Sequence, residues 1–238
     1  MPAETGSAPH LILGFDTSGA YCAVALVRPR SDGHASLLAD RHEDMARGQA
    51  ESLLPMAEAL LADAGATWRD LAAIGVGTGP GNFTGVRVAV SAARGLALGL
   101  GIPAVGVSSF AAFGHGHDGP VIVALPGARG AVHLCRLRAG TEEAMLTARR
   151  DELGAALADL AAGEAICVTG PEAATVASAT NSPVLRVCHP IAEAVARIAA
   201  GRYTVPVARP APVYLRPADA APPSEAPPRL LPDAAIVS

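Results

Sequence analysis

Residues 10–27 read "HLILGFDTSGAYCAVALV". Two apolar segments flank the turn at Ser18-Gly19, a pattern that predicts a β-hairpin. A third segment with strand composition, "ASLLADRH" at 35–42, follows after a short loop. Short strands joined by short turns are typical of an antiparallel meander, so we expect three paired strands at the start of the fold.

The meander is followed by alternating helical and extended segments. Apolar residues recur at helical spacing over 48–65, where Gly65 predicts the end of the helix. The rest of this half is predicted as a buried strand at 71–79, a helix at 84–100, a strand at 103–109 and a short helix at 109–114.

The same order of elements returns in the second half of the chain. A meander that leads into alternating helices and strands forms a mixed sheet with helices on its faces. The repeat therefore predicts an α/β protein of two ribonuclease-H-like lobes, the architecture of the actin, hexokinase and Hsp70 group. The predicted elements of the second half are a hairpin from 121–130 and 131–140, strands at 143–150, 165–170 and 184–187, and helices at 151–162, 171–179 and 190–201.

The domain boundaries follow from this repeat. We expect a flexible N-terminus at 1–9, an N-terminal lobe at 10–109 and a smaller C-terminal lobe at 110–204. Nine of the 20 prolines lie beyond residue 205, and proline is excluded from helix interiors and inner strands. We therefore expect 205–220 to pack back as an extended segment and 221–238 to be disordered.

Composition and charge narrow the class of protein. Half of the 238 residues are apolar and 17% are charged, which is typical of a globular domain. The formal net charge of −4 argues against a chain built mainly to grip nucleic acid. The chain starts without the basic n-region of a signal peptide, and no charge-free apolar stretch of about 20 residues is present to span a bilayer. We expect a soluble cytoplasmic protein without membrane contact.

The cysteines and histidines do not have the spacing of a metal site. No two cysteines form a C-x-x-C pair, and each lies in or beside an apolar run, so we expect free thiols in the core. His115 and His117 are two apart in a glycine loop and could share only an adventitious metal, because a catalytic site needs spaced and supported ligands. We predict solvated loop histidines and no resident metal. The cysteines are Cys22, Cys135, Cys167 and Cys188.

The turn Asp16-Thr17-Ser18 has two interpretations. An acid followed by hydroxyls after the first strand fits a phosphate loop, in which the acid of kinases and ATPases of this fold holds Mg²⁺ through water. A polar turn capped by Asp16 or Ser18 explains the same residues. Aligning the two hairpins puts Pro126 where Asp16 stands, and proline offers neither an acid nor an N–H. The missing second acid weighs against phosphoryl transfer.

The glycine-rich segment 77–85, "GTGPGNFTG", fits neither common phosphate motif. It lacks the lysine of a P-loop and the third glycine of a dinucleotide-binding turn. We infer that these glycines allow sharp turns and close approach of neighbouring elements. Asn82 or Thr84 is expected to cap the helix that follows.

The helix at 84–100 is predicted to have two different faces. Arg87, Ser91 and Arg94 fall on one side of it, and small apolar residues form a stripe on another. A plain surface helix would carry more charge than this one does. We therefore expect one face to pack on the sheet and the other to be available to a partner.

Four motifs resemble the bacterial TsaB (YeaZ) family: "ILGFDTS" at 12–18, "GQAESLLP" at 48–55, the long segment at 75–109 and "PVYLRPADA" at 212–220. The resemblance implies a non-catalytic paralogue of TsaD. Together with TsaD and the ATPase TsaE, such proteins make N6-threonylcarbamoyladenosine in tRNAs that read ANN codons. We expect no cofactor for the chain itself, and its acidity suggests that it meets tRNA only through the complex.

The resemblance also implies a surface for TsaD, formed by helices 49–64 and 84–100. The arginines would meet carboxylates across the interface, and Leu54 would fill a pocket. TsaE would join the TsaB–TsaD complex, and the chain alone could form a homodimer. One departure is the acid that family members often carry at the start of the second hairpin, which this chain lacks. The implied contact residues are Glu51, Leu54, Pro55, Glu58, Arg87, Ser91 and Arg94.

Three other functions stay open from the sequence. An ATP-dependent transferase or hydrolase would use Asp16, Thr17 and Ser18. A metallopeptidase-like protein is suggested by the H-x-x-x-H metal site of TsaD, although no two of the seven histidines here are four apart. A self-associating module would use an apolar helix face that lacks another partner.

Overall fold

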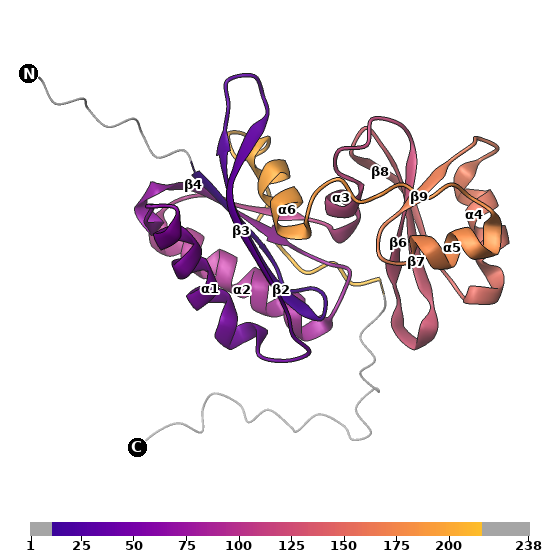
Figure 1. Ribbon diagram of the computed structural model, residues 1–238, viewed down its shortest axis with the longest axis horizontal. Coiled ribbons are helices and arrows are strands. Elements are labelled where there is room, and N and C mark those ends of the chain that lie inside the picture. Colours follow the sequence, from indigo (N-terminus) through magenta and orange to yellow (C-terminus); the bar gives the residue numbers. More distant parts are fainter. Residues whose placement is uncertain (1–10, 216–238) are drawn as a thin grey trace, which may run out of the picture.

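The computed structural model describes residues 11–215, which form two lobes side by side (Figure 1). The N-terminal lobe is built on a five-stranded mixed sheet with the strand order β3-β2-β1-β4-β5. β1 pairs antiparallel with β2 and parallel with β4, so the predicted meander leads directly into the parallel part of the sheet. The elements are β1 (Leu11–Asp16), β2 (Tyr21–Pro29), β3 (Ala35–Asp44), α1 (Gln49–Asp63), β4 (Leu71–Gly77), α2 (Phe83–Leu100) and β5 (Ala104–Val107).

Both faces of this sheet are covered, which explains why β1 is buried along its whole length. Side chains alternate between the faces, so Leu13 and Phe15 join the core under α1 and α2, and Ile12 joins the opposite core. The opposite face is covered by α6 (Ile191–Ala200). Gly14 lets this helix come close, since an added Cβ there would lie 2.6 Å from Ala196 Cβ.

The position of α6 differs from the expectation for residues 190–201. We expected this helix to complete the C-terminal lobe, and it packs instead on β1, β2 and β4 of the N-terminal lobe. Its alanine-rich surface is buried nearly all round, because the helix fills the face of the sheet that α1 and α2 leave uncovered. The chain therefore forms the C-terminal lobe first and then runs back to the N-terminal lobe, where α6 packs on the first sheet.

The C-terminal lobe repeats the strand order of the first sheet as β8-β7-β6-β9. The expected strand at 184–187 is reduced to one parallel bridge between Val168 and Val184. The two repeated mixed sheets with flanking helices confirm the predicted α/β class. The elements are α3 (Ser109–Gly114), β6 (Val121–Pro126), β7 (Val132–Arg138), β8 (Thr141–Ala148), α4 (Leu153–Ala161), β9 (Cys167–Thr169) and α5 (Ala173–Thr180), with short 3₁₀ turns at Ala128–Gly130 and Arg150–Glu152. A similar turn, Trp68–Asp70, precedes β4 in the N-terminal lobe.

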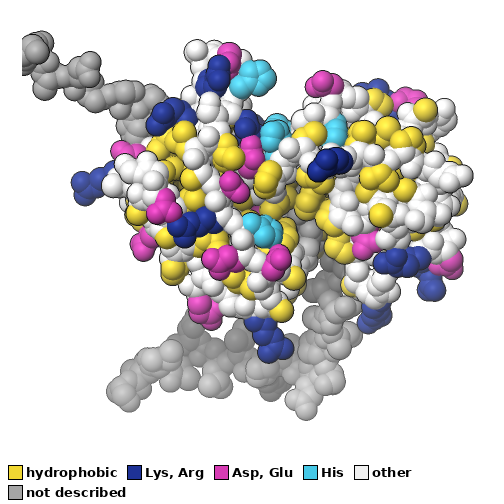
Figure 2. Space-filling model, viewed as in Figure 1, with side chains coloured by type: hydrophobic (Ala, Val, Ile, Leu, Met, Phe, Trp, Pro, Cys, Tyr) yellow, Lys and Arg dark blue, Asp and Glu magenta, His cyan; other side chains and the backbone are white. Residues whose placement is uncertain are grey.

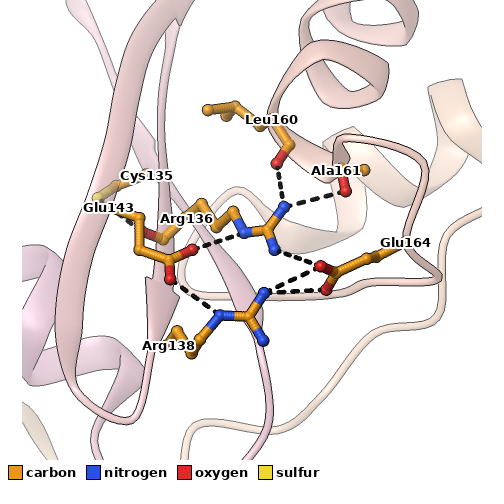
Figure 3. A network of polar contacts seen from close by, with 7 residues as sticks. All are labelled: Cys135, Arg136, Arg138, Glu143, Leu160, Ala161 and Glu164. Carbon is orange, nitrogen blue, oxygen red and sulfur yellow. Dashed lines mark hydrogen bonds and ion pairs between the residues drawn. The ribbon is translucent and has the colours of Figure 1, made fainter.

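A buried arginine ties α4 to the C-terminal sheet (Figure 3). Arg136 donates from Nη1 to the carbonyl oxygens of Leu160 and Ala161 at 2.9 and 3.0 Å, which caps the C-terminal end of α4. It also pairs with Glu143 and Glu164 at 2.8 and 3.0 Å. The helix carbonyls and the two carboxylates together compensate the desolvation of the guanidinium.

After α6 the chain runs back without regular structure along residues 205–215, called here the C-terminal strap. The backbone N–H of Val213 donates to the carbonyl of Thr78 at 2.8 Å. Pro210 is buried beside Gly106 of β5, and Leu215 packs against an apolar cluster of the C-terminal lobe. The strap thus contacts both lobes. The expectations for 1–9 and 221–238, and for the end of the segment 205–220, lie outside the described residues.

Within residues 11–215, one helix has the length and composition to cross a membrane. This is α2, with 18 residues and a mean hydropathy of 1.2. The core helix of a soluble α/β protein meets the same test, and the buried side of α2 packs on the first sheet through Val86, Ala89, Val90 and Ala93.

Candidate functional site

The turn after β1 is covered by the glycine-rich segment. The Thr17 hydroxyl donates to the carbonyl of Gly85 at 2.7 Å, and the Asn82 N–H donates to the carbonyl of Ser18 at 2.6 Å. No side chain fits at two of the glycines: an added Cβ would lie 1.9 Å from Thr17 O at Gly85 and 2.3 Å from Ser18 O at Gly81. The glycines therefore allow two loops to pack backbone against backbone.

Asp16 is completely buried under this cover. Its Oδ1 accepts hydrogen bonds from the Ser18 N–H, the Ser18 hydroxyl and the Tyr21 hydroxyl at 2.8, 2.7 and 2.9 Å. Its Oδ2 faces Gly77 and has no hydrogen-bond partner among residues 11–215. Desolvation by burial raises the pKa of Asp16 in spite of the hydrogen bonds to Ser18 and Tyr21. These are the contacts of a polar turn, and they leave no solvent-facing acid for Mg²⁺.

The second hairpin places proline where the first has its acid. Pro126 ends β6 and pairs with Val132 of β7, just as Asp16 ends β1 and pairs with Ala23 of β2. The sequence alignment of the two hairpins therefore agrees with their registers. A polyphosphate site that needs one acid from each hairpin would therefore lack the acid of the second hairpin, because Pro126 stands at that position.

The N-terminal end of α2 is already capped. Asn82 Oδ1 accepts from the backbone N–H groups of Thr84 and Gly85 at 3.0 and 3.1 Å. Asn82 or Thr84 was expected to cap this helix, and in the structure Asn82 is the capping residue. Because its carboxamide satisfies these two donors, they are not free to bind phosphate.

The residues that the resemblance implies for partner binding all lie exposed on α1 and α2. The two helices lie side by side on one face of the first sheet (Figure 1). Gly95, Leu98 and Gly99 of α2 are also exposed and extend the same surface, although they were not expected there. They lie one helical turn beyond Ser91, Arg94 and Gly95, and this spacing is the signal that could have predicted them. We call the whole set the docking surface: Glu51, Leu54, Pro55 and Glu58 of α1, with Arg87, Ser91, Arg94, Gly95, Leu98 and Gly99 of α2.

The docking surface is hollowed between its two helices. A groove of about 350 Å³ runs between α1 and α2 and is lined by Leu54, Trp68 and Leu100 among others. An added Cβ would meet nothing within 4 Å at Gly95 or Gly99. Glycine inside a helix costs about 1 kcal/mol relative to alanine, and both glycines leave open space on the surface of α2. The side chain of Leu98 is 85% exposed beside them.

The charges on the docking surface are divided between its two helices. Glu51 and Glu58 are seven residues apart on α1, and Arg87 and Arg94 are seven apart on α2. Arg94 makes no hydrogen bond or ion pair in the described part of the chain. Charges of both signs are also interspersed over the face of the molecule shown in Figure 2. That face carries no continuous basic surface of the kind that nucleic acid requires.

Arg87 is held by the C-terminal strap. Its Nε donates to the hydroxyl of Tyr214 at 2.8 Å, and its guanidinium carbon lies 3.7 Å from the centroid of the Phe83 ring. The Phe83 and Tyr214 rings are themselves 5.3 Å apart. Helical spacing places Arg87 on the exposed side of α2, and the motif at 212–220 contains Tyr214, but neither predicts a contact between residues 127 positions apart.

His115 and His117 are not simply solvated, as the sequence suggested. Both ring nitrogens of His117 lie 3.7–3.8 Å from Cys188 Sγ, and the His115 ring packs on His189. Burial lowers the pKa of His115. No group of three or more histidine, cysteine or acidic side chains within the described ranges is arranged to hold a metal.

The four cysteines differ in burial. All four thiols are free, and Cys22 and Cys135 lie in the cores as expected. Cys167 is partly buried and Cys188 is exposed, so the expectation of four core thiols is wrong for Cys188. The segment around Cys188 lacks the strand that we expected just before it.

Comparisons with known proteins bear on this site. The family described as "TsaD: tRNA N6-adenosine threonylcarbamoyltransferase" matches residues 42–170, more than half of the chain. The tRNA threonylcarbamoyladenosine biosynthesis protein TsaB of Escherichia coli (strain K12) is 37% identical over 105 residues, which cover 44% of this chain and 43% of that protein. The match thus spans less than half the length of this curated relative.

Solved structures agree with the sequence matches. The crystal structure of an uncharacterized protein with similarity to peptidase YEAZ from Pseudomonas aeruginosa superposes with a TM-score of 0.68 at 25% identity, covering 87% of this chain and 100% of that one. The ethanolamine utilization protein EutJ from Carboxydothermus hydrogenoformans has a TM-score of 0.52 at 12% identity over 82% of this chain and 91% of its own, and so shares the fold alone. The chain belongs to the protein family that TsaD defines and, within it, to the TsaB (YeaZ) family.

Proposed function

We propose that this protein is a non-catalytic subunit of the cytoplasmic machinery that makes N6-threonylcarbamoyladenosine in tRNA. In this proposal its docking surface binds TsaD, TsaE joins the resulting complex, and tRNA is met through the complex. The observation that carries the proposal is the open, glycine-containing face of α1 and α2, on which every residue implied for partner binding is exposed.

The architecture of the turn after β1 supports a role without catalysis. The acid that would hold Mg²⁺ is buried beneath the glycine-rich segment, and Pro126 replaces its counterpart. The α2 N-terminus is capped by its own Asn82. An ATP-dependent transferase or hydrolase would need these groups to face a nucleotide, so this alternative has less support.

The docking surface favours a helical partner over an extended one. Small residues at Gly95 and Gly99 allow close approach of a helix, and Leu98 projects beside them as an apolar anchor. The exposed glutamates of α1 and the exposed arginines of α2 favour a partner that places basic groups opposite α1 and acidic groups opposite α2. A second copy of this chain also meets that requirement, which supports a homodimer in the absence of TsaD.

The test is association with TsaD from the same organism, measured by size-exclusion chromatography with light scattering. We expect a heterodimer that forms at the expense of any homodimer. Gly95→Leu should remove the heterodimer because it fills the space that a partner helix needs. Gly154→Leu is the matched control, since Gly154 is an exposed helical glycine of the C-terminal lobe with the same open surroundings.

Charge reversal gives a second test of the same surface. Arg87→Glu combined with Arg94→Glu should weaken the heterodimer, and unchanged co-purification with TsaD would remove these two residues from the interface. If the unmodified chain never associates with TsaD, with or without ATP and TsaE, the scaffold proposal is wrong. Mg²⁺-dependent ATP turnover by the isolated chain that is lost in Asp16→Ala would support the enzyme instead.

A further inference from the structure

We propose that Phe83 and Tyr214 hold Arg87 as a preformed binding site for a carboxylate, so that the C-terminal strap is part of the docking surface. The occupant is an aspartate or glutamate side chain of the partner protein. This inference rests on the proposed function, and it adds the recognition chemistry and a segment of the chain that the helices alone do not include.

The geometry restrains Arg87 from two sides. The Phe83 ring lies under the guanidinium at 3.7 Å from its centroid, within the range of a cation–π interaction. The Tyr214 hydroxyl accepts from Nε at 2.8 Å, which fixes the rotation of the guanidinium plane. A long arginine side chain ordinarily loses rotamer freedom when it binds, and here that freedom is already restricted before the partner arrives.

The free edge of the guanidinium has the geometry for a carboxylate. Nε is engaged with Tyr214, and the two terminal nitrogens of Arg87 make no hydrogen bond within residues 11–215. Two parallel N–H groups on a planar fork match the two oxygens of a carboxylate. The cluster also exposes about half of two aromatic side chains, Phe83 at 50% and Tyr214 at 47%. Arginine and aromatic residues together are what the central contacts of protein interfaces contain.

The surrounding charges favour a carboxylate of a protein over the phosphates of tRNA. Two further arginines, Arg94 and Arg209, line a groove of about 590 Å³ further along α2 and would attract any anion, so the discrimination comes from the acidic residues nearby. Exposed Glu51 and Glu58 on neighbouring α1 would repel a polyanion.

The strap keeps Tyr214 in place through its neighbours in the chain. Val213 is hydrogen-bonded to Thr78 in the loop before α2, and Leu215 is packed on the C-terminal lobe. Tyr214 is therefore anchored on both sides and is a positioning residue for Arg87. Both lobes contribute to the placement of a side chain on the docking surface.

The experiment is a double-mutant cycle on the affinity for TsaD, measured by isothermal titration calorimetry with the full chain. Tyr214→Phe removes only the hydroxyl and should weaken binding by about three- to tenfold. Arg87→Ala should weaken it by about tenfold or more, with Arg87→Lys in between because lysine lacks the fork. In the Arg87→Ala background, Tyr214→Phe should have no further effect. Tyr203→Phe, a partly buried tyrosine beside α6, is the control.

These measurements test the proposed function, the carboxylate site and the role of Tyr214 separately. If the unmodified chain does not bind TsaD, the proposed function fails. If it binds and Tyr214→Phe or Arg87→Lys binds equally well, the carboxylate site is wrong. An equal loss from Tyr214→Phe with and without Arg87 would show that Tyr214 does not act through Arg87. A loss of affinity for a tRNA fragment, with TsaD binding unchanged, would overturn the carboxylate in favour of phosphate.

Discussion

The hydroxyl of Thr17 donates a hydrogen bond of 2.7 Å to the carbonyl oxygen of Gly85, which joins residues 68 positions apart in the chain. The bond closes the turn after β1 onto the start of α2, and the carbonyl of Thr17 in turn fills the space where Gly85 would carry a side chain. The position of α2, which carries part of the docking surface, therefore depends on the contacts between its first turn and the turn after β1.

Two glycines of α2 should respond in opposite ways to the same substitution. Gly85→Ala should destabilise the protein by about 2–3 kcal/mol, because the new methyl group would overlap the Thr17 carbonyl. Gly99→Ala should stabilise it by about 0.5–1 kcal/mol, since Gly99 has open surroundings inside a helix. Urea denaturation of the two variants checks both signs, and a stable Gly85→Ala variant would show that the two loops are not packed as described.

The buried carboxyl of Asp16 predicts how stability depends on pH. Burial raises the pKa of Asp16 above its ordinary value of 3.8, so the folded protein binds this proton more tightly than the unfolded chain does. Its contribution to the free energy of unfolding is therefore full below about pH 4 and is lost as the pH rises through the folded-state pKa.

The comparison that isolates this effect is with Asp16→Asn, which cannot titrate. From pH 4 to pH 7, the unmodified protein should lose stability relative to the variant in urea denaturation. An acid that faces solvent and holds a metal would give the opposite trend, so a gain in relative stability with rising pH would contradict the buried state of Asp16.

The arginines of β7 should differ in their effect on stability. Arg136→Ala should destabilise the protein by about 2–3 kcal/mol, because it leaves the carbonyls at the end of α4 without their donor and removes the buried partner of Glu143 and Glu164. Arg138→Ala should cost much less than Arg136→Ala, although Arg138 pairs with the same two glutamates, since its side chain is 45% exposed and water screens its ion pairs. Thermal unfolding of both variants tests the contrast, and equal losses would contradict it.

The thiols should differ in reactivity toward Ellman's reagent. Cys188 is exposed and should react first, and the fast phase should disappear in Cys188→Ser. Burial raises the pKa of Cys22 to about 11 and that of Cys135 to about 12, so both thiols should stay unreactive until the protein unfolds. Rapid reaction of two or more thiols in the folded Cys188→Ser variant would show that the cores are open.

Local patterns were sufficient to predict most of the elements. The turn at Ser18-Gly19, the helical spacing after residue 48 and the repeat in the second half led to the correct class and to the paired strands that open each sheet. The glycine segment was correctly interpreted as a site of close approach, because it fits neither phosphate motif and glycine has few other uses.

The remaining features depend on contacts between distant residues. The apolar pattern of residues 190–201 predicts a helix and does not specify which sheet the helix covers, so α6 was expected in the C-terminal lobe although it packs on the N-terminal sheet. The contact between Arg87 and Tyr214 has no local signature, because it requires the strap to cross the start of α2. The cover that the glycine-rich segment forms over Asp16 could not be predicted for the same reason, because it joins residues far apart in the sequence.

The return of the chain to the first sheet at α6 has a consequence for biosynthesis. In the sequence, the C-terminal lobe lies between two parts of the N-terminal lobe, so the first sheet stays bare on one face until α6 has left the ribosome. A chain cut after residue 109 would expose Ile12, Ala73 and Val105 to water and should aggregate. Segment 110–189, by contrast, has its own apolar core and can condense while synthesis continues.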